Sequence, residues 1–126
     1  MNGLHLTADL SGCADLALLV DRTALAAHCR RITEAAGLTV VGEHWHQFPH
    51  GADGQPGGLT GMLLLAESHV ALHTWPELAA VTLDVYVCNY GSDNSAKARA
   101  LMDGLVTQFQ ARSADLQSLQ RGRRPL

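Results

Sequence analysis

Residues 58–88, GLTGMLLLAESHVALHTWPELAAVTLDVYVC, decide the fold, because they hold three apolar segments separated by turn signals. The continuous apolar run from Met62 to Ala66 predicts a buried strand. The alternation from His69 to Trp75 predicts a second strand, which ends at Trp75-Pro76 because proline disfavours continued pairing. Val81 to Cys88 alternates again. We therefore expect three consecutive strands in this part of the chain.

Polar groups interrupt these strands at places where chemistry is common. The polar face of Val81–Cys88 ends at Cys88, and Ser68 lies at the start of the strand predicted from His69 to Trp75. Catalytic groups concentrate at such strand ends. Between Ser68 and Cys88, a serine, two histidines, a carboxylate and a thiol occur within about twenty residues. This set suits a hydrolase, a metal site or a self-modifying enzyme.

The order of these residues closely resembles one family. AESHVALHTWPE followed by DVYVC is similar to the core motif of the small prokaryotic S-adenosylmethionine decarboxylases, and GLHLTADLSGC resembles the opening strand of that family. The resemblance covers most of residues 3–111. It implies a pyruvoyl cofactor, which the chain makes from its own serine by self-cleavage between Glu67 and Ser68. The products are residues 1–67, the beta chain, and residues 68–126, the alpha chain.

The resemblance also implies a role for each matching residue. In the implied reaction, the substrate's amine forms a Schiff base with the pyruvoyl ketone, carbon dioxide leaves, and a thiol protonates the α-carbon. Ser68 is the pyruvoyl precursor. The other implied residues are His73 for proton transfer in processing, Thr60 as the processing hydroxyl, Cys88 as the proton donor, Glu77 at the ribose, Asp9 as the acidic residue of the first strand, and Phe48 near adenine.

The implied function is decarboxylation of S-adenosylmethionine, which supplies an aminopropyl donor for spermidine biosynthesis. The chain departs from many relatives at Leu78–Ala80, where they have aromatic residues and glycine, and in a longer loop at 50–58. Some relatives act on L-ornithine or L-arginine, so a decarboxylase of either amino acid is an alternative. A processing-dead regulatory or binding subunit is another.

Composition restricts the partners. The 126-residue chain has a formal net charge of −3 and no extended basic field, which argues against nucleic acid and anionic membrane as partners. No run approaches the length of a membrane span, and the N-terminus does not resemble a secretion signal. Three cysteines without CxxC spacing argue against a disulfide framework and a thiolate zinc site. We expect a single-domain cytoplasmic protein without a metal.

Several chemically capable residues have simpler interpretations. His69 is separated from His73 by about 13 Å along a strand, too far to share an ion, so we interpret it as structural. His44 and His46 share a strand face and leave zinc as a minor alternative to a solvated polar face. We also interpret Cys13 and Cys29 as small buried hydrophobic residues and Asp84 as a structural carboxylate.

The remaining segments predict the outer elements. Before the central strands we expect a strand over residues 3–10, a helix over 22–36 with Asp21 as N-cap and Gly37 after its end, and a strand over 38–48. After them we expect a helix capped by Ser92 or Asp93, with an apolar stripe from Ala98 to Phe109, and a short strand over 116–119. Residues 121–126 are expected to be a disordered end, with a basic cluster of Arg121, Arg123 and Arg124.

This order of elements predicts an α+β sandwich in which two helices cover one face of a mostly antiparallel sheet. The other face of the sheet is left without a cover. So small a domain gains stability from oligomerisation, and we expect two processed protomers to pair sheet to sheet as a homodimer.

Overall fold

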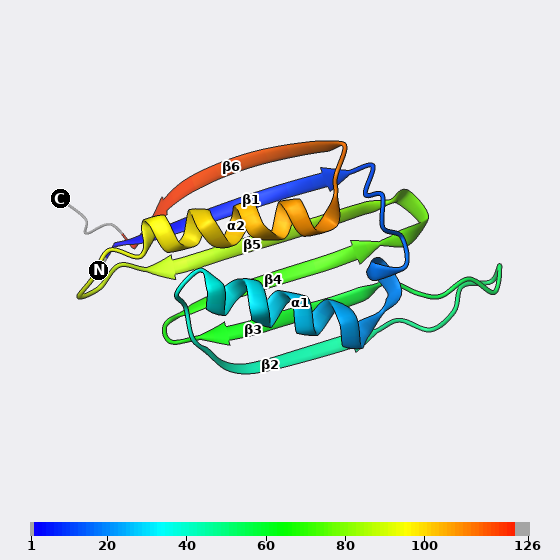
Figure 1. Ribbon diagram of the computed structural model, residues 1–126, viewed down its shortest axis with the longest axis horizontal. Helices are drawn as coiled ribbons and strands as arrows, with labels where there is room; N and C mark the ends of the chain where they lie inside the picture. Colours follow the sequence, from blue (N-terminus) through cyan, green and yellow to red (C-terminus); the bar gives the residue numbers. More distant parts are fainter. Residues whose placement is uncertain (1, 123–126) are drawn as a thin grey trace.

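A six-stranded antiparallel sheet organises the computed structural model, which describes residues 2–122 (Figure 1). The strands lie in the order β2-β3-β4-β5-β1-β6. Their bounds are β1 Gly3–Ser11, β2 Val40–Gln47, β3 Leu59–Leu65, β4 Ser68–Trp75, β5 Ala80–Cys88 and β6 Ser113–Arg121. The helices are α1 Arg22–Ala35 and α2 Ser95–Phe109, with short 3-10 turns η1 Leu18–Val20 and η2 Pro76–Leu78.

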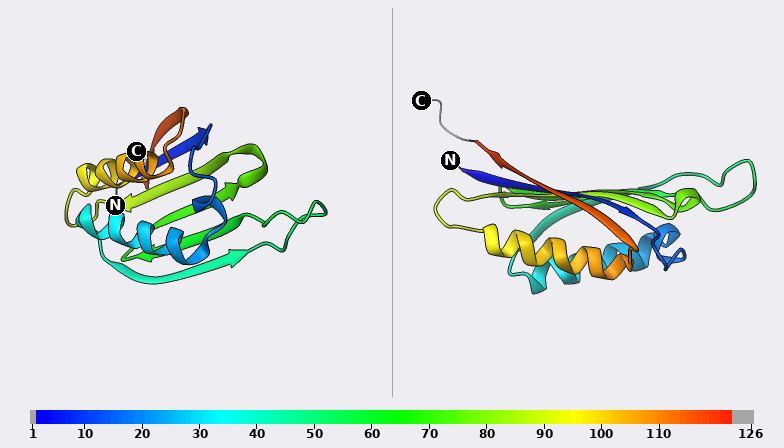
Figure 2. Two further views of the ribbon diagram at one scale, coloured as in Figure 1. Left: turned by 45° about the vertical axis from the view of Figure 1, so that its right-hand side comes forward. Right: turned by 90° about the horizontal axis from the view of Figure 1, so that it is seen from above.

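Both helices pack on the same face of the sheet (Figure 2). We call the opposite face, which no helix formed by residues 2–122 covers, the open face. The core lies between helices and sheet, where alternate strand residues such as Leu6, Leu72, Leu83 and Val85 are buried. The predicted α+β class, with two helices on one face of an antiparallel sheet, is confirmed.

The apolar run in β3 does not make a strand buried on both faces, so that prediction is wrong. Leu59, Leu63 and Leu65 are buried under the helices, whereas Met62 is 38% exposed and Leu64 is 47% exposed on the open face. A run of consecutive leucines fits either arrangement, because side chains alternate whatever their type. The sheet therefore presents apolar groups on its open face.

The predicted N-cap is confirmed for α1 and wrong for α2. Asp21 is the N-cap of α1, and its carboxylate accepts a hydrogen bond from the Ala24 N–H at 3.0 Å. At α2 the N-cap is Asn94, while the Asp93 carboxylate accepts from the Ser95 N–H at 2.9 Å. That hydrogen bond lowers the pKa of the Asp93 carboxyl. The predicted capping by Ser92 or Asp93 is therefore wrong by one residue or more, because the helix begins at Ser95, although the Asp93 side chain still accepts from the first helical N–H.

The two helices approach closely at Gly104. A Cβ built on Gly104 would lie 2.7 Å from Cγ2 of Ile32 in α1, closer than carbon atoms can pack. Glycine costs about 1 kcal/mol relative to alanine within a helix. At this position the missing side chain makes room for the neighbouring helix.

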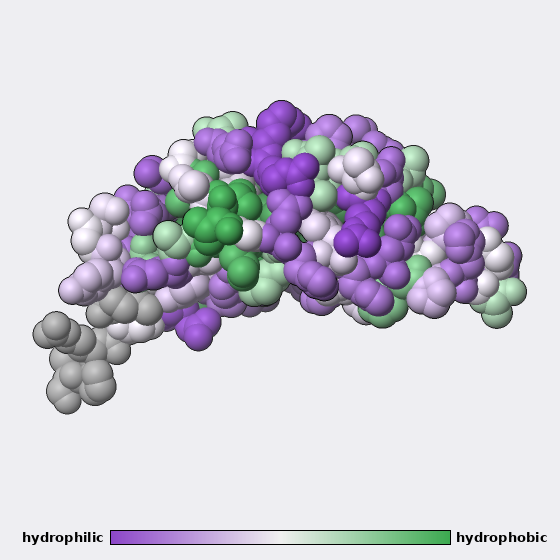
Figure 3. Space-filling view, turned by 90° about the horizontal axis from the view of Figure 1, so that it is seen from below, coloured by the Kyte–Doolittle hydropathy of each residue, from purple (hydrophilic) through white to green (hydrophobic). Residues whose placement is uncertain are grey.

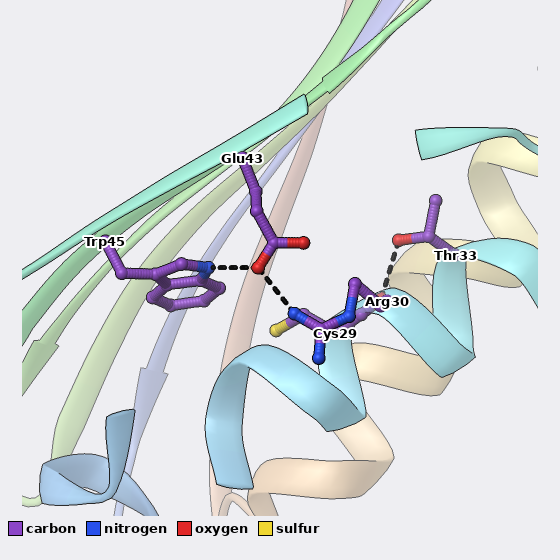
Figure 4. Close-up of polar contacts among 5 residues, drawn as sticks. All are labelled: Cys29, Arg30, Thr33, Glu43 and Trp45. Carbon is purple, nitrogen blue, oxygen red and sulfur yellow. Dashed lines mark hydrogen bonds and ion pairs between the residues drawn. The ribbon is translucent and has the colours of Figure 1, made fainter. Parts of the chain in front are cut away.

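Polar contacts join α1 to the edge strand β2 (Figure 4). The Glu43 carboxylate accepts hydrogen bonds from the Arg30 guanidinium and from the Trp45 indole N–H, the second at 3.2 Å. Cys29 lies beside this pair in α1, and its carbonyl accepts from the Thr33 hydroxyl at 2.7 Å. Burial, followed by the charge of Glu43, raises the pKa of the Cys29 thiol to about 12. A buried thiol with a raised pKa carries little of the reactive thiolate at neutral pH, in keeping with the interpretation of Cys29 as structural.

The last strand is longer than the sequence predicts. β6 spans nine residues and pairs along the full length of β1. Every β6 residue is exposed, so hydrophobic periodicity gives little sign of the strand. Arg121, predicted to begin a disordered end, belongs to β6, and its guanidinium donates to His5 Nδ1 at 3.1 Å. Arg123 and Arg124 lie outside the described residues.

The loop between β2 and β3 extends beyond the sheet and forms a lobe at the right-hand end of the molecule in Figure 3. The Phe48 N–H donates to the Gly58 carbonyl at 2.9 Å and closes the neck of the loop. Within the part of the chain that the structure describes, we find no helix long and apolar enough to cross a membrane.

Candidate active site

The predicted cleavage site occupies the tip of a tight hairpin. Leu65 and Ser68 are paired at the ends of β3 and β4, which leaves only Ala66 and Glu67 to make the turn. Glu67 has φ of 56°, in the left-handed region that residues with a Cβ seldom occupy. Such a conformation stores about 1–3 kcal/mol of strain. The strained residue is the one whose carbonyl precedes Ser68.

Cys88 meets Ser68 at this end of the sheet. The Cys88 N–H donates to the Ser68 Oγ at 3.0 Å, although twenty residues separate them in the sequence. The two residues come from the first position of β4 and the last position of β5. Cys88 is 8% exposed. Adjacent antiparallel strands therefore bring the predicted pyruvoyl precursor and the predicted proton donor together.

The loop after β5 contacts Cys88 in a way that the sequence did not indicate. The Tyr90 N–H donates to the Cys88 Sγ at 3.4 Å, and the Asn94 side-chain amide donates to the Cys88 carbonyl at 2.8 Å. The sequence identifies residues 89–94 only as turn chemistry. Turn-forming composition does not say which group an asparagine amide contacts.

Thr60 and His73 form a second pair at the other end of β4. The two residues are cross-strand neighbours in β3 and β4, and Thr60 Oγ1 lies 2.9 Å from His73 Nδ1. The adjacent Thr74 hydroxyl is buried, accepts from the Leu59 N–H at 2.8 Å and donates to the Leu19 carbonyl at 2.7 Å. These bonds hold the strand ends and η1 around the Thr60–His73 pair.

A cavity of about 1150 Å³ opens at the end of the sheet that holds the Thr60–His73 pair. Its walls come from η1, the 48–58 loop, the ends of β3 and β4, and η2. Four predicted site residues line it: Phe48, Thr60, His73 and Glu77. The Phe48 ring is 51% exposed and contacts His46 edge to face, with 4.8 Å between centroids. The lining is mainly apolar and carries the carboxylates of Asp53 and Glu77.

The predicted site residues thus fall into two groups. Ser68 lies five residues before His73 on one extended strand, which places them about 16 Å apart. Asp9 shares the cross-sheet row of His73, since Asp9 pairs with Thr82 and Thr82 pairs with His73. Asp9 therefore lies on the open face near the second group. The roles assigned to these residues remain predictions.

Between the two groups, the open face carries a cluster of ionisable and aromatic side chains. The His69 and Tyr86 rings lie 5.5 Å apart, and His5 contacts both at 6.3 and 6.0 Å. His5 Nε2 lies 3.8 Å from an Asp84 carboxylate oxygen. Burial and the neighbouring His5 lower the pKa of the His69 imidazole. The structure thus places His69 and Asp84 in one contact network with His5.

The remaining candidates are two histidines of the edge strand, of which His46 borders the Thr60–His73 group, and the buried Cys13. His44 and His46 are exposed on the edge strand β2, opposite Met62 and Thr60. Among residues 2–122, no group of three histidine, cysteine or acidic side chains is arranged to hold a metal ion. Cys13 is buried, and burial raises the pKa of its thiol.

Comparisons with known proteins agree with the geometry. A family model described as S-adenosylmethionine decarboxylase matches residues 4–122. The S-adenosylmethionine decarboxylase proenzyme of Aquifex aeolicus is 38% identical over 124 residues, which are 95% of this chain and 81% of the relative. The proenzyme of Picrophilus torridus is 35% identical over 120 residues, which are 95% of this chain and 84% of the relative.

The similarity extends to the fold. The crystal structure of the adenosylmethionine decarboxylase from Aquifex aeolicus matches this structure with a TM-score of 0.83 at 36% identity, and the match covers 98% of this chain and 92% of the other. Sequence and fold therefore agree over nearly the whole chain. This chain belongs to the S-adenosylmethionine decarboxylase family.

Proposed function

We propose that this chain is the proenzyme of an S-adenosylmethionine decarboxylase that cleaves itself between Glu67 and Ser68. The observation that carries the proposal is the strained hairpin, in which Glu67 has φ of 56°. The hydroxyl of the following residue, Ser68, contacts the Cys88 N–H. The product of the processed enzyme would be decarboxylated S-adenosylmethionine, the aminopropyl donor for spermidine biosynthesis. Membership of the family supports this assignment.

Self-cleavage starts with the serine. Attack of the Ser68 Oγ on the carbonyl carbon of Glu67 replaces the amide by an ester and frees the Ser68 nitrogen. Elimination then breaks the Cβ–O bond, which releases Glu67 as the carboxylate end of residues 1–67 and leaves dehydroalanine. Hydrolysis of its imine tautomer consumes water, releases ammonia and leaves the pyruvoyl group at the start of residues 68–126. The strain at Glu67 favours opening of this peptide bond.

The residues around Ser68 suit a pyruvoyl group. Ser68 is the residue from which the group would form, and the Cys88 backbone N–H already reaches its Oγ. When present, a pyruvoyl group supplies a conjugated carbonyl that accepts the electrons released by loss of carbon dioxide. Cys88 would hold the proton that the α-carbon then needs.

The cavity beside the Thr60–His73 pair has the character of a nucleoside site. Its volume of about 1150 Å³ and apolar lining suit a ligand of that size. The exposed Phe48 ring can stack on adenine, and the Glu77 carboxylate can accept from ribose hydroxyls. Ornithine or arginine would instead need an acidic group for a distal cation and no stacking ring. These features favour S-adenosylmethionine, even with Leu78–Ala80 replacing the residues of many relatives.

A second copy of the chain would complete the site. Because Thr60 and His73 lie about 16 Å from Ser68 along β4, they cannot assist the cleavage of their own chain. The open face carries exposed apolar side chains, among them Met62, Leu64 and Leu119, which a second open face can cover. Sheet-to-sheet pairing with the strands running in opposite directions would bring one copy's His73 toward the other's Ser68. We propose a homodimer of this kind.

The proposal is tested by measuring carbon dioxide release from S-adenosylmethionine, L-ornithine and L-arginine in parallel. Mass spectrometry of the same protein should show fragments 1–67 and 68–126, the second beginning with a pyruvoyl group. We expect release from S-adenosylmethionine alone. The Ser68→Ala variant, which lacks the precursor hydroxyl, should remain a single 126-residue chain and release nothing.

Each other outcome has a defined meaning. Cleaved protein that releases carbon dioxide only from ornithine or arginine would overturn the substrate and keep the self-cleavage. An uncleaved wild-type chain that binds S-adenosylmethionine would indicate a regulatory subunit. Cleavage of Ser68→Ala as efficient as that of wild type would rule out the serine chemistry.

A further inference from the structure

We propose that Asn94 is a positioning residue for Cys88: its side-chain amide holds the Cys88 backbone and so sets the place of the thiol. The inference rests on the proposed function, which makes Cys88 the proton donor. It concerns the loop between β5 and α2, which lies at the Ser68 end of the sheet, opposite the end that holds the cavity.

Asn94 reaches back across five residues of loop to the end of β5. Its Nδ2 donates to the Cys88 carbonyl at 2.8 Å. Its own N–H donates to the Asn89 Oδ1 at 2.8 Å, and the Asn89 Nδ2 donates to the Ser95 Oγ at 3.1 Å. The side chains of Asn89 and Asn94 therefore bridge the loop by hydrogen bonds, and one of these bonds ends at Cys88, the last residue of β5.

The closed loop places donors around Cys88. With the Cys88 carbonyl held by Asn94, the chain turns so that the Tyr90 N–H points at Sγ, 3.4 Å away. On its other side, the Cys88 N–H donates to the Ser68 Oγ at 3.0 Å. A change in the loop would therefore move the thiol relative to Ser68. Displacement of a reacting group by about 1 Å can lower a rate by roughly a hundredfold.

Helix capping does not account for the Asn94 side chain. Asn94 is the N-cap of α2, yet among the described residues its side chain makes no capping hydrogen bond and instead contacts the Cys88 carbonyl. The neighbouring Asp93 makes the bond to the helix start, through the Ser95 N–H. The contact with Cys88 needs a donor, which the amide of asparagine supplies and the carboxylate of aspartate does not.

This difference gives a discriminating pair of variants. Aspartate and serine are good N-caps, so Asn94→Asp and Asn94→Ser both keep the helix start. Aspartate replaces the amide donor by an acceptor that repels the carbonyl, and the serine hydroxyl is one bond too short to reproduce the contact of the Asn94 Nδ2. We expect kcat per pyruvoyl-bearing chain to fall roughly tenfold to a hundredfold in both variants, with KM for S-adenosylmethionine unchanged. Asp93→Ala is the matched control: it loses the hydrogen bond from the Ser95 N–H at the helix start, so its melting temperature falls while kcat stays at the wild-type value.

A second measurement follows the thiol without turnover. In the uncleaved Ser68→Ala background, the rate of Cys88 alkylation by iodoacetamide is measured by peptide mass spectrometry, with the buried Cys13 and Cys29 as internal references. Cys88 is now 8% exposed. Loosening the loop should expose it, so Asn94→Asp should raise the alkylation rate severalfold and Asp93→Ala should leave it unchanged.

The results separate this inference from the function on which it rests. If Cys88→Ala retains full turnover, the proposed function of the thiol fails. If Cys88→Ala is inactive but Asn94→Asp and Asn94→Ser match wild type in kcat and alkylation rate, the thiol keeps its role and the positioning inference is overturned. If Asp93→Ala loses kcat as strongly as Asn94→Asp, the loop acts only through stability and the inference is again overturned.

Discussion

Ser68 and Cys88 show how a single hydrogen bond can define a site. The Oγ of one accepts from the backbone N–H of the other at 3.0 Å, at the edge of the sheet where β4 begins and β5 ends. The three cysteines differ in their surroundings. Cys29 is buried beside Glu43 and its pKa is raised to about 12, whereas Cys88 lies next to the strained hairpin. Position therefore distinguishes the candidate proton donor from the structural thiols.

Replacement of the thiol separates making the cofactor from using it. Cys88→Ala keeps the backbone N–H that contacts Ser68, so cleavage should still yield substantial pyruvoyl. Turnover should fall by roughly 10²-fold or more, the usual contribution of a positioned general acid. Fragment masses report the first effect and carbon dioxide release the second. Cys13→Ala is the control and should be cleaved and active; full activity of Cys88→Ala would remove this thiol from the mechanism.

The sequence indicates the residue types of the site better than their contacts. The motif around Ser68 and His73 predicts the candidate residues, because their order along the chain is specific. It does not reveal that Asn94 donates to the Cys88 carbonyl, since such a bond depends on how the loop folds over the strand end. Five-residue spacing on one predicted strand already implies about 16 Å between Ser68 and His73, but it does not show which side chains of other strands meet each of them.

Among the elements, β3 depends on a glycine for its place in the core. Gly61 lies opposite Trp45 of β2, and a Cβ built on it would come within 2.2 Å of the indole ring. The indole is buried and its N–H is held by Glu43, so it cannot move aside freely. The ring therefore occupies the space above the glycine and fixes the edge of the sheet under α1.

This arrangement predicts opposite effects for two glycines on neighbouring strands. Gly61→Ala should destabilise the fold by about 1–3 kcal/mol, the cost of overpacking a filled core. At Gly42 in β2 a Cβ would meet the Leu64 side chain at an ordinary 3.5 Å. Gly42→Ala should be neutral or stabilise by up to about 1 kcal/mol, because alanine loses less entropy than glycine on folding. Urea unfolding midpoints measure both; equal midpoints would contradict the packing account.

Elements with a regular pattern and a cap are predictable from sequence. Asp21 and the apolar spacing after it define α1, and alternation defines β1, β4 and β5. The prediction is wrong for Met62 and Leu64 of β3, which are exposed, and for the length of β6. In both cases the outcome depends on what covers the strand, and in β6 only the short stretch from Leu116 to Leu119 carries a hydrophobic signal.

At the scale of the whole molecule, the site residues divide between two ends of the sheet. Ser68 and Cys88 mark one end, while the cavity and the Thr60–His73 pair mark the other. A two-fold axis on the open face would exchange these ends between two copies. Each dimer would then contain two sites built from both chains.

Mixed dimers test this division. Ser68→Ala cannot be cleaved, and His73→Ala keeps the serine but lacks its partner, so each variant alone should remain whole. When the two are produced together, the His73→Ala chain should be cleaved in mixed dimers, because its Ser68 meets the His73 of the other variant. Mass spectrometry of differently tagged chains identifies which one is cut. An uncleaved mixture that forms mixed dimers would show that the two ends do not cooperate between chains.

The sequence alone determined the family and the order of strands and helices, and it supplied the candidate residues of the site, because periodicity, caps and a specific motif are local properties of the chain. Only the tertiary structure decided which groups meet. Antiparallel pairing joins Ser68 to Cys88 and Thr60 to His73, yet keeps the two pairs at opposite ends of β4. The register of the strands, and which of their faces is buried, arise from contacts between distant segments, which no local pattern encodes.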